Sequence, residues 1–321
     1  MKLLVTGGAG YIGSVVTAQL ITAGHDVVVL DNLSTGHRDA LIDGAQFIYE
    51  ELSHVAQILD KSFDGVLHFA AKSLVAESVQ DPEVYWDNNV VGTLALLAAM
   101  RVTGVERLIF SSTAATYGVP HRVPIQEVDP AAPINPYGQT KLAVDMAITG
   151  AAHAHGLAAA SLRYFNVGGA HGGLGERHSP ETHLIPNILQ VPLGIRESVP
   201  IFGSDYATHD GTCIRDYLHV VDLGRAHLLA LDAVQPGKHN IYNLGSGTGY
   251  TVREVVDTCR RVTGHPVPSV DRERRSGDPP ALVASSELIQ AELGWRAELD
   301  LDRIVSDSWS FAKEQHEQPA R

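Results

Sequence analysis

The segment Gly7-Gly8-Ala9-Gly10-Tyr11-Ile12-Gly13 decides the fold of this chain. It follows the short apolar run Leu3–Val5 and opens a helix-length segment, so it lies where a strand passes into a helix. Glycines there let the backbone turn sharply and approach a pyrophosphate, whose charge then faces the free N–H groups at the helix N-terminus. We therefore expect a dinucleotide beside Gly7, Gly10, Tyr11, Ile12 and Gly13; a glycine-rich turn without a ligand is the alternative.

A carboxylate at the end of the second expected strand indicates which dinucleotide is bound. Asp31 lies 18 residues beyond Gly13, where its oxygens can accept hydrogen bonds from both hydroxyls of an adenosine ribose. The same carboxylate would repel a 2′-phosphate. We therefore expect NAD in preference to NADP, with Asn32 at the same site, although an aspartate at a strand end can also simply form a turn.

Short β-rich runs alternate with longer helical ones through the first half of the chain. The expected strands are Leu3–Val5, Asp26–Leu30, Phe47–Tyr49, Gly65–Phe69, Arg107–Phe110 and Ala158–Arg163. Parallel strands need helical crossovers, which cover both faces of a sheet and leave the strands apolar throughout. The pattern therefore predicts an α/β fold with a doubly wound parallel (Rossmann) sheet.

After Arg163 the sequence changes to a Gly- and His-rich segment followed by prolines at close spacing. We place a dinucleotide-binding domain at residues 1–166 and a smaller, mixed α/β substrate-binding lobe at 167–321. The apolar-periodic run 217–233 is expected to return to the first domain as a helix.

Composition excludes several classes of function. The formal net charge is −13, and no run of Lys or Arg is longer than Arg274-Arg275, so nucleic acid is not an expected partner. No apolar stretch approaches the roughly 20 residues that cross a bilayer, and the first one is too short for a signal peptide. Cys213 and Cys259 are too few for a disulfide framework or a Cys-based zinc site. We expect a cytoplasmic protein without a membrane partner and without a metal.

Tyr137 and Lys141 stand four residues apart in a helical segment that begins near Pro136, so they share one face of that helix. An adjacent ammonium and a nicotinamide cation both favour the phenolate of tyrosine, whose ordinary pKa is about 10, and so make Tyr137 a base. Ser111–Thr113 end an apolar strand at the edge where open parallel sheets bind ligands. A hydroxyl there can bridge Tyr137 to a substrate. The alternative is that these hydroxyls cap a turn, which is less credible for Thr113 than for the two serines.

Further segments, spread through the chain, add to these motifs. They are HFAAKSLVAESV (68–79), DNNVVGT (87–93), SSTAATYG (111–118), PYGQTK (136–141), RYFNVGGA (163–170), IFGSDYATHDGTCIRDYLHV (201–220) and IYNLGSGTGY (241–250). Together with TGGAGYIG (6–13) they resemble, in order and over nearly the whole length, the extended short-chain dehydrogenase/reductases, and among these the UDP-galactose 4-epimerases. Such a series is far more specific than any single motif.

The resemblance implies interconversion of UDP-glucose and UDP-galactose by transient oxidation at carbon 4 of the sugar. Tyr137 would take the proton of the 4-hydroxyl, Thr113 would relay or orient it, and hydride would pass to bound NAD. The 4-keto sugar would then swing about its pyrophosphate and take the hydride back on its other face. Lys141 would position the nicotinamide ribose and keep Tyr137 deprotonated.

The resemblance also implies the residues of two binding sites. Beyond the glycine-rich turn, those for NAD are Asp31, Asn32, Glu51, Leu52, Phe69, Ala70, Ala71, Asn88, Ser111, Tyr137, Lys141 and Tyr164. Those for the UDP-hexose are Thr113, Asn166, His183, Leu184, Phe202, Arg215, Arg275, Asp278 and Leu282. The arginines would bind phosphates, Phe202 would stack on the uracil, and Asp278 would bind a ribose hydroxyl.

Some positions depart from the family pattern. Glu50-Glu51-Leu52 stands where the family often has Gly-Asp at the adenine, so we expect Glu51 to make that contact from one carbon farther away. His183 replaces an Asn, and Ser73 takes the place of a cofactor-contacting Lys. Leu282 stands where some relatives carry a bulky Tyr, which predicts room for UDP-N-acetylglucosamine.

Other interpretations stay open. A nucleotide-sugar 4,6-dehydratase needs an acidic pair where this chain has Ala114-Ala115. A UDP-glucuronate epimerase or decarboxylase is excluded less well, and a non-catalytic NAD(H)-binding scaffold is opposed by the intact Tyr137, Lys141 and Thr113. We also expect a homodimer.

Overall fold

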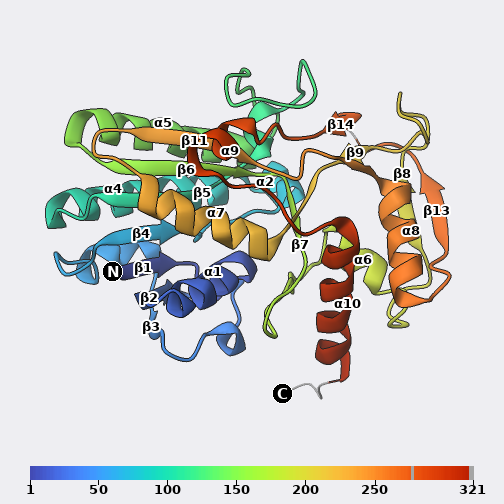
Figure 1. Ribbon diagram of the computed structural model, residues 1–321, viewed down its shortest axis with the longest axis horizontal. Coiled ribbons are helices and arrows are strands. Elements are labelled where there is room, and N and C mark those ends of the chain that lie inside the picture. The colour runs from blue at the N-terminus through green and yellow to red at the C-terminus, as the bar shows by residue number, and fades with distance from the viewer. Residues whose placement is uncertain (276–277, 318–321) are drawn as a thin grey trace.

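Seven parallel strands form the central sheet of the chain, whose computed structural model describes residues 1–275 and 278–317 (Figure 1). In order across the sheet they are β11 (His239–Leu244), β6 (Ala158–Tyr164), β5 (Arg107–Thr113), β4 (Gly65–His68), β1 (Lys2–Thr6), β2 (Asp26–Asp31) and β3 (Gln46–Tyr49). Every neighbouring pair is parallel. The predicted doubly wound α/β fold is confirmed, and so are all six predicted strands.

Helices cover both faces of this sheet (Figure 1). The helices α4 (Gly92–Thr103) and α5 (Pro136–His155) pack on one face, and α1 (Tyr11–Thr22) and α7 (Val220–Ala233) pack on the other. Within β1, Leu3 and Val5 face α1 and α7, whereas Leu4 between them faces α4 and α5. Because both faces are buried, the strands are apolar without alternation.

The seventh strand, β11, was not predicted from the sequence. It lies at an edge of the sheet, and His239, Asn240 and Asn243 interrupt its apolar residues. The chain reaches it through α7, which packs on α1 and accepts a hydrogen bond from Gln19 Nε2 at the carbonyl oxygen of Val221 (3.1 Å). The segment that returns to the first domain is therefore longer than the predicted 217–233, because it ends with β11.

The second lobe has its own apolar core between three helices, seen on the right of Figure 1. These are α6 (Leu184–Leu189), α8 (Val252–Thr263) and α10 (Leu301–Glu317). Its strands are β7 (Asn166–Gly168) beside β10 (Tyr217–His219), β8 (Val199–Phe202) beside β13 (Ser269–Arg272), and a three-stranded sheet of β12 (Tyr250–Thr251), β9 (Ile214–Arg215) and β14 (Ala281–Leu282). The remaining helices are α2 (Val75–Gln80), α3 (Pro82–Tyr85) and α9 (Glu287–Leu293), with short helical turns at Arg38–Ala40, Leu52–Gln57, Trp86–Val91 and Ala114–Tyr117.

The strand order fixes where a ligand can bind. From β1 the chain runs outward to β2 and β3, and then returns to β4 on the other side of β1. Open α/β sheets bind ligands beyond the carboxyl ends of their strands at such a reversal. Within the described parts of the chain, no helix is both long and apolar enough to cross a bilayer.

Candidate active site

One cavity of about 1350 Å³ lies beyond the carboxyl ends of the central strands, and residues of both lobes line it. Every residue that the sequence predicted for catalysis, for the cofactor or for the substrate is among its lining residues. The structure thus brings together side chains from Gly7 to Leu282. Their individual roles stay predictions.

The turn after β1 needs glycine at two positions. Gly7 has a φ of +74°, and a Cβ atom on it would lie 2.5 Å from the backbone nitrogen of Ala70, in the turn after β4. A Cβ atom on Gly13 would lie 2.2 Å from the carbonyl oxygen of Gly7. Among the described residues no side chain caps α1 at Gly10. The first N–H groups of α1 are therefore available to a phosphate.

Asp31 holds this turn as well as ending β2. Its Oδ2 accepts a hydrogen bond from the backbone nitrogen of Ala9 at 2.9 Å, and its Oδ1 accepts one from that of Leu33 at 2.8 Å. Each carboxylate oxygen can accept a second bond, and Asp31 lines the cavity. The turn-forming role and the geometry expected for ribose binding are thus combined in one residue.

The loop after β3 presents Glu51 to the cavity. Asn32 Nδ2 donates a hydrogen bond to Glu51 Oε2 at 2.9 Å. Glu50 instead accepts bonds within its own loop, from the backbone nitrogen of Glu51 at 2.8 Å and in a contact of 2.9 Å with His54 Nδ1. Of the two neighbouring carboxylates, Glu51 is therefore the better placed for the predicted adenine contact.

The start of α5 places Tyr137 beside Thr113. Asn135 caps this helix, since its Oδ1 accepts a hydrogen bond from the backbone nitrogen of Gly138 at 2.8 Å. Gly138 lets the helix approach the turn after β5 closely, because a Cβ atom on it would lie 2.5 Å from the carbonyl oxygen of Ala115. The ring of Tyr137 packs edge-on against Tyr85, with 6.4 Å between centroids.

Burial shifts the pKa values of Tyr137 and Lys141 in opposite directions. Burial raises the pKa of Tyr137 to about 12, and a hydrogen bond with Thr113 opposes this only partly. Burial lowers the pKa of Lys141 to about 7, against the charge of Asp145, and Lys141 Nζ donates a hydrogen bond to the carbonyl oxygen of Ser111 at 2.7 Å. Burial thus shifts both pKa values toward the neutral forms of the two groups. That Lys141 and a bound nicotinamide cation together favour the phenolate of Tyr137 stays a prediction.

The three hydroxyls at the end of β5 have different partners. Thr113 Oγ1 accepts a hydrogen bond from the backbone nitrogen of Ala115 at 3.1 Å, so it caps the turn, and its hydroxyl also lowers the pKa of Tyr137. This corrects the expectation that turn capping suits Thr113 least. Ser112 Oγ donates to the buried carboxylate of Asp145 at 3.2 Å, and the carbonyl oxygen of Ser111 accepts from Lys141 Nζ at 2.7 Å.

On the second lobe, the predicted substrate residues contact one another in two pairs. Arg215 forms an ion pair with Asp278 at 3.3 Å and donates to the carbonyl oxygen of Pro279 at 3.0 Å. The guanidinium of Arg275 lies over the ring of Phe202, 4.1 Å from its centroid. The predicted uracil-stacking residue thus carries a cation on one ring face.

The other predicted substrate residues lie on elements that bound the cavity. Asn166 begins β7, and His183 and Leu184 lie at the start of α6. Leu282, in β14, is partly buried and packs against a small apolar cluster that includes Tyr117 and Phe165.

Two cavity-lining residues beside His183 were missed by sequence reasoning. Glu176 and His178 precede it in the same loop, and His178 Nδ1 makes a hydrogen bond with Glu176 Oε1. The spacing Glu-x-His-x₄-His was the available signal, but the 16 histidines looked scattered along the chain.

Comparison with known proteins agrees with this geometry. The NAD dependent epimerase/dehydratase family matches residues 3–245. UDP-glucose 4-epimerase of Corynebacterium glutamicum is 56% identical over 314 residues, 97% of this chain and 95% of that protein. UDP-glucose 4-epimerase from Brucella ovis, solved in complex with NAD, is 45% identical with a TM-score of 0.92, over 96% of this chain and 97% of that one. The enzyme from Bifidobacterium longum, solved with NAD⁺ and UDP, is 35% identical with a TM-score of 0.91, over 98% of each chain.

Proposed function

Because the chain belongs to the NAD dependent epimerase/dehydratase family, we propose that it is a UDP-sugar 4-epimerase that interconverts UDP-glucose and UDP-galactose. The proposal rests on one observation. The glycine-rich turn, the Tyr137–Lys141–Thr113 group and the arginine-bearing wall of the second lobe all line the same cavity. An enzyme that oxidises and reduces the same carbon needs these three parts around one substrate.

The residues around the glycine-rich turn fit NAD. A phosphate can approach the N-terminus of α1 because Gly7 and Gly13 carry no Cβ atom there, and Asp31 is placed to accept the ribose hydroxyls. Bound NAD supplies a hydride acceptor for carbon 4 of the sugar and a donor for the return step, and its cationic ring favours the phenolate of a buried tyrosine.

Tyr137 is the proton-transfer group of the proposed reaction. Its oxygen takes the proton of the 4-hydroxyl as carbon 4 is oxidised, and it returns a proton when the sugar has turned its other face to the cofactor. Thr113, whose hydroxyl lowers the pKa of Tyr137, orients the exchanged proton. Lys141 is two per cent exposed and donates a hydrogen bond to the Ser111 carbonyl. In the proposed reaction it binds the nicotinamide ribose of NAD.

The second lobe holds the UDP half of the substrate while the sugar turns. Arg215 and Arg275 bind the diphosphate, for which guanidinium geometry is suited, and Phe202 binds the uracil. Asp278 binds the uridine ribose, and Asn166, His183 and Leu184 complete the diphosphate contacts. Leu282 bounds the space in which the sugar turns, and its size admits an N-acetylated hexose.

The rival activities fit this site less well. The turn after Thr113 carries Ala114 and Ala115, so it lacks the acidic pair with which a 4,6-dehydratase eliminates water. The curated relatives are named as UDP-glucose 4-epimerases, at 42–56% identity over nearly their whole length. A UDP-glucuronate enzyme and a non-catalytic scaffold are therefore not favoured.

We also place the enzyme in the cytoplasm and propose a homodimer. Cys213 and Cys259 are both buried free thiols, which suits a reducing compartment. An apolar stripe on α4 suits a second copy of the chain.

The test is turnover of UDP-galactose by the purified protein without added cofactor, together with release of dinucleotide on denaturation. We expect bound NAD and formation of UDP-glucose, because the returned hydride must come from the cofactor that accepted it. Full activity of a dinucleotide-free preparation would overturn the mechanism, and bound NAD without turnover of any UDP-sugar would favour the scaffold.

A further inference from the structure

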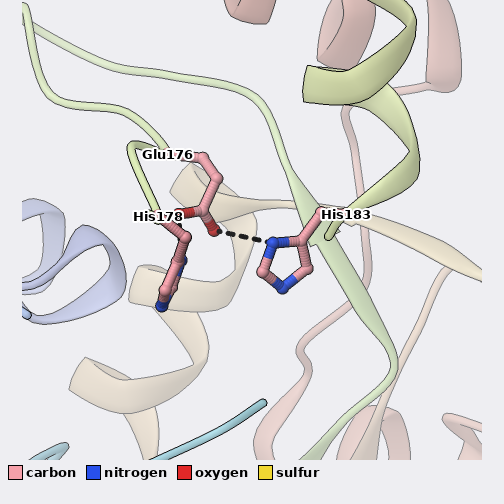
Figure 2. A group of neighbouring side chains, drawn as sticks. All are labelled: Glu176, His178 and His183. Carbon is pink, nitrogen blue, oxygen red and sulfur yellow. Dashed lines mark hydrogen bonds and ion pairs between the residues drawn. The ribbon is translucent and has the colours of Figure 1, made fainter. Parts of the chain in front are cut away.

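A partly buried carboxylate lies between two imidazole rings in the loop that links β7 to α6. Figure 2 shows Glu176 with His178 on one side and His183 on the other. His178 Nδ1 bonds Glu176 Oε1, His183 Nδ1 lies 3.8 Å from Glu176 Oε2, and the three ligand atoms all lie within 4.8 Å of one another. Within the described parts of the chain, no other group of three or more His, Cys, Asp or Glu side chains converges in this way.

The charge of Glu176 has no permanent cationic partner close by. In residues 1–275 and 278–317 its ion pairs are with His178 and His183 alone, while the guanidinium of the adjacent Arg177 pairs with Asp39 at 2.8 Å. A buried carboxylate beside neutral imidazoles is costly unless a cation joins it. The group can satisfy this need with protons on the imidazoles or with a metal ion.

We propose that Glu176, His178 and His183 bind one divalent transition-metal ion of the zinc class. Two imidazoles and one carboxylate form a ligand set that zinc uses in tetrahedral sites with an open fourth position. In such a site, bonds of about 2.1 Å place neighbouring ligand atoms roughly 3.4 Å apart, so the observed separations need only small side-chain movements. Nitrogen ligands disfavour Mg²⁺ and Ca²⁺, which prefer oxygen.

The three residues of the cluster also line the cavity in which a diphosphate is proposed to lie. The competing arrangement is an ion-pair network without metal. In it, His183 Nδ1 bonds Glu181 Oε1 at 2.7 Å, and the bond to Glu176 raises the pKa of His178. The metal site does not rest on the proposed epimerase activity, and it departs from the sequence-based expectation that the chain holds no metal.

The experiment is equilibrium dialysis of Zn²⁺ at pH 8 against protein stripped with a chelator and desalted, with metal counted by elemental analysis. We expect one tightly held Zn²⁺ per chain in the wild type and at least about tenfold weaker binding in His178→Ala and in Glu176→Gln, since each removes a direct ligand. His171→Ala, at an exposed histidine of the same loop, is the matched control and keeps wild-type affinity.

Two further measurements keep the test decisive if a variant folds poorly. Zn²⁺, but not Mg²⁺, raises the Tm of the wild type, because a ligand that binds only the folded state stabilises it. Co²⁺ in the wild type gives the visible absorption bands of a tetrahedral nitrogen and oxygen site. The proposal fails if the wild type retains no Zn²⁺ and shows no such shift, or if the cluster variants bind as tightly as His171→Ala.

Discussion

At the scale of single residues, we expect turnover to depend on the hydroxyl group of Tyr137. In Tyr137→Phe the ring keeps its packing against Tyr85, but the proton-transfer group is lost. General-base catalysis typically contributes about 10²- to 10⁴-fold, so we expect kcat to fall by that factor while UDP-sugar affinity is largely retained. Steady-state kinetics with UDP-galactose and titration with UDP measure the two effects.

The matched control is Tyr85→Phe. It removes a phenol hydroxyl that lies 2.7 Å from two acceptors, the carbonyl oxygen of Leu74 and Glu77 Oε2, and that donates its one hydrogen to either of them. We expect this variant to keep most of its turnover. If Tyr137→Phe also turns over at the wild-type rate, another group must be the base.

The buried ammonium of Lys141 makes stability depend on pH. Burial lowers its pKa in the folded chain to about 7, below the ordinary value of about 10.4, so between these values the unfolded chain binds more protons. The wild type therefore gains stability as pH rises from 7 toward 10, and the cost of the buried charge is fully present below pH 7. Lys141→Met removes that cost together with activity.

We expect Lys141→Met to be more stable than the wild type at pH 6 to 7, with the difference shrinking by roughly 2–3 kcal/mol by pH 9. Urea unfolding at several pH values measures it, and Lys238→Met, at an exposed lysine, is the control. A difference that stays constant with pH would mean that Lys141 is protonated alike in the folded and unfolded chain.

We expect Leu282 to control which sugars can turn in the cavity that it lines. It is only partly buried, and a Tyr in its place would fill space that an acetamido group needs. We expect measurable epimerisation of UDP-N-acetylglucosamine by the wild type, lost in Leu282→Tyr while UDP-galactose turnover is kept. Leu282→Met, which conserves volume, is the control. An equal loss on both substrates would show that Leu282 only packs the apolar cluster.

Residues that act together through local spacing could be predicted from the sequence, whereas those joined only by the fold could not. Tyr137 and Lys141 share a helix face at a spacing of four, which the sequence displays directly. Asp145 meets Arg163 and Ser112 in a buried ion pair and hydrogen bond that link three different elements. No local pattern reveals such contacts.

At the scale of elements, the approach of α5 to the turn after β5 positions the catalytic side chains. A Cβ atom on Gly138 would lie 2.5 Å from the carbonyl oxygen of Ala115, which is backbone and cannot move aside as a side chain can. We expect Gly138→Ala to destabilise the fold by about 1–3 kcal/mol and to lower kcat by separating Tyr137 from Thr113. Chemical unfolding and steady-state kinetics measure the two effects.

Gly150→Ala, in the same helix, is the matched control. A Cβ atom there meets nothing within 4 Å, so helix propensity alone decides the result, and we expect a gain of about 0.5–1 kcal/mol with unchanged turnover. Equal effects of the two substitutions would show that the close approach at Gly138 is unimportant.

The predictability of a strand follows how continuous its apolar run is, and not how deeply it is buried. The edge strand β3 was predicted although none of its residues is fully buried, and β11 was missed although its last three residues are buried. The six predicted strands lie between helices or pack on them, and their apolar runs stand out in the sequence. The edge strand β11 mixes polar and apolar residues and joins the sheet only after α7 has returned, so nothing near it in the sequence marks it as a seventh strand.

At the scale of the whole molecule, an apolar stripe remains exposed along α4. Leu94 and Val102 of α4 are 48% and 86% exposed, and Val91, the last residue of the helical turn before α4, is 56% exposed. Met146 on the neighbouring α5 is 68% exposed. Apolar side chains gathered on one face of a water-facing helix indicate a protein interface. Both α4 and α5 lie on the face of the sheet away from α7, so a second chain can bind there without contacting α7.

We expect the wild type to be a dimer in solution and Leu94→Glu to shift it toward the monomer, because two facing copies would bury two unpaired carboxylates at the same interface. Sedimentation velocity over a range of protein concentrations measures the change. Val128→Glu, at a loop residue that is 84% exposed outside the stripe, is the matched control and stays dimeric. A monomeric wild type would contradict the proposed dimer. A Leu94→Glu variant as dimeric as the control would show that the interface does not lie on α4.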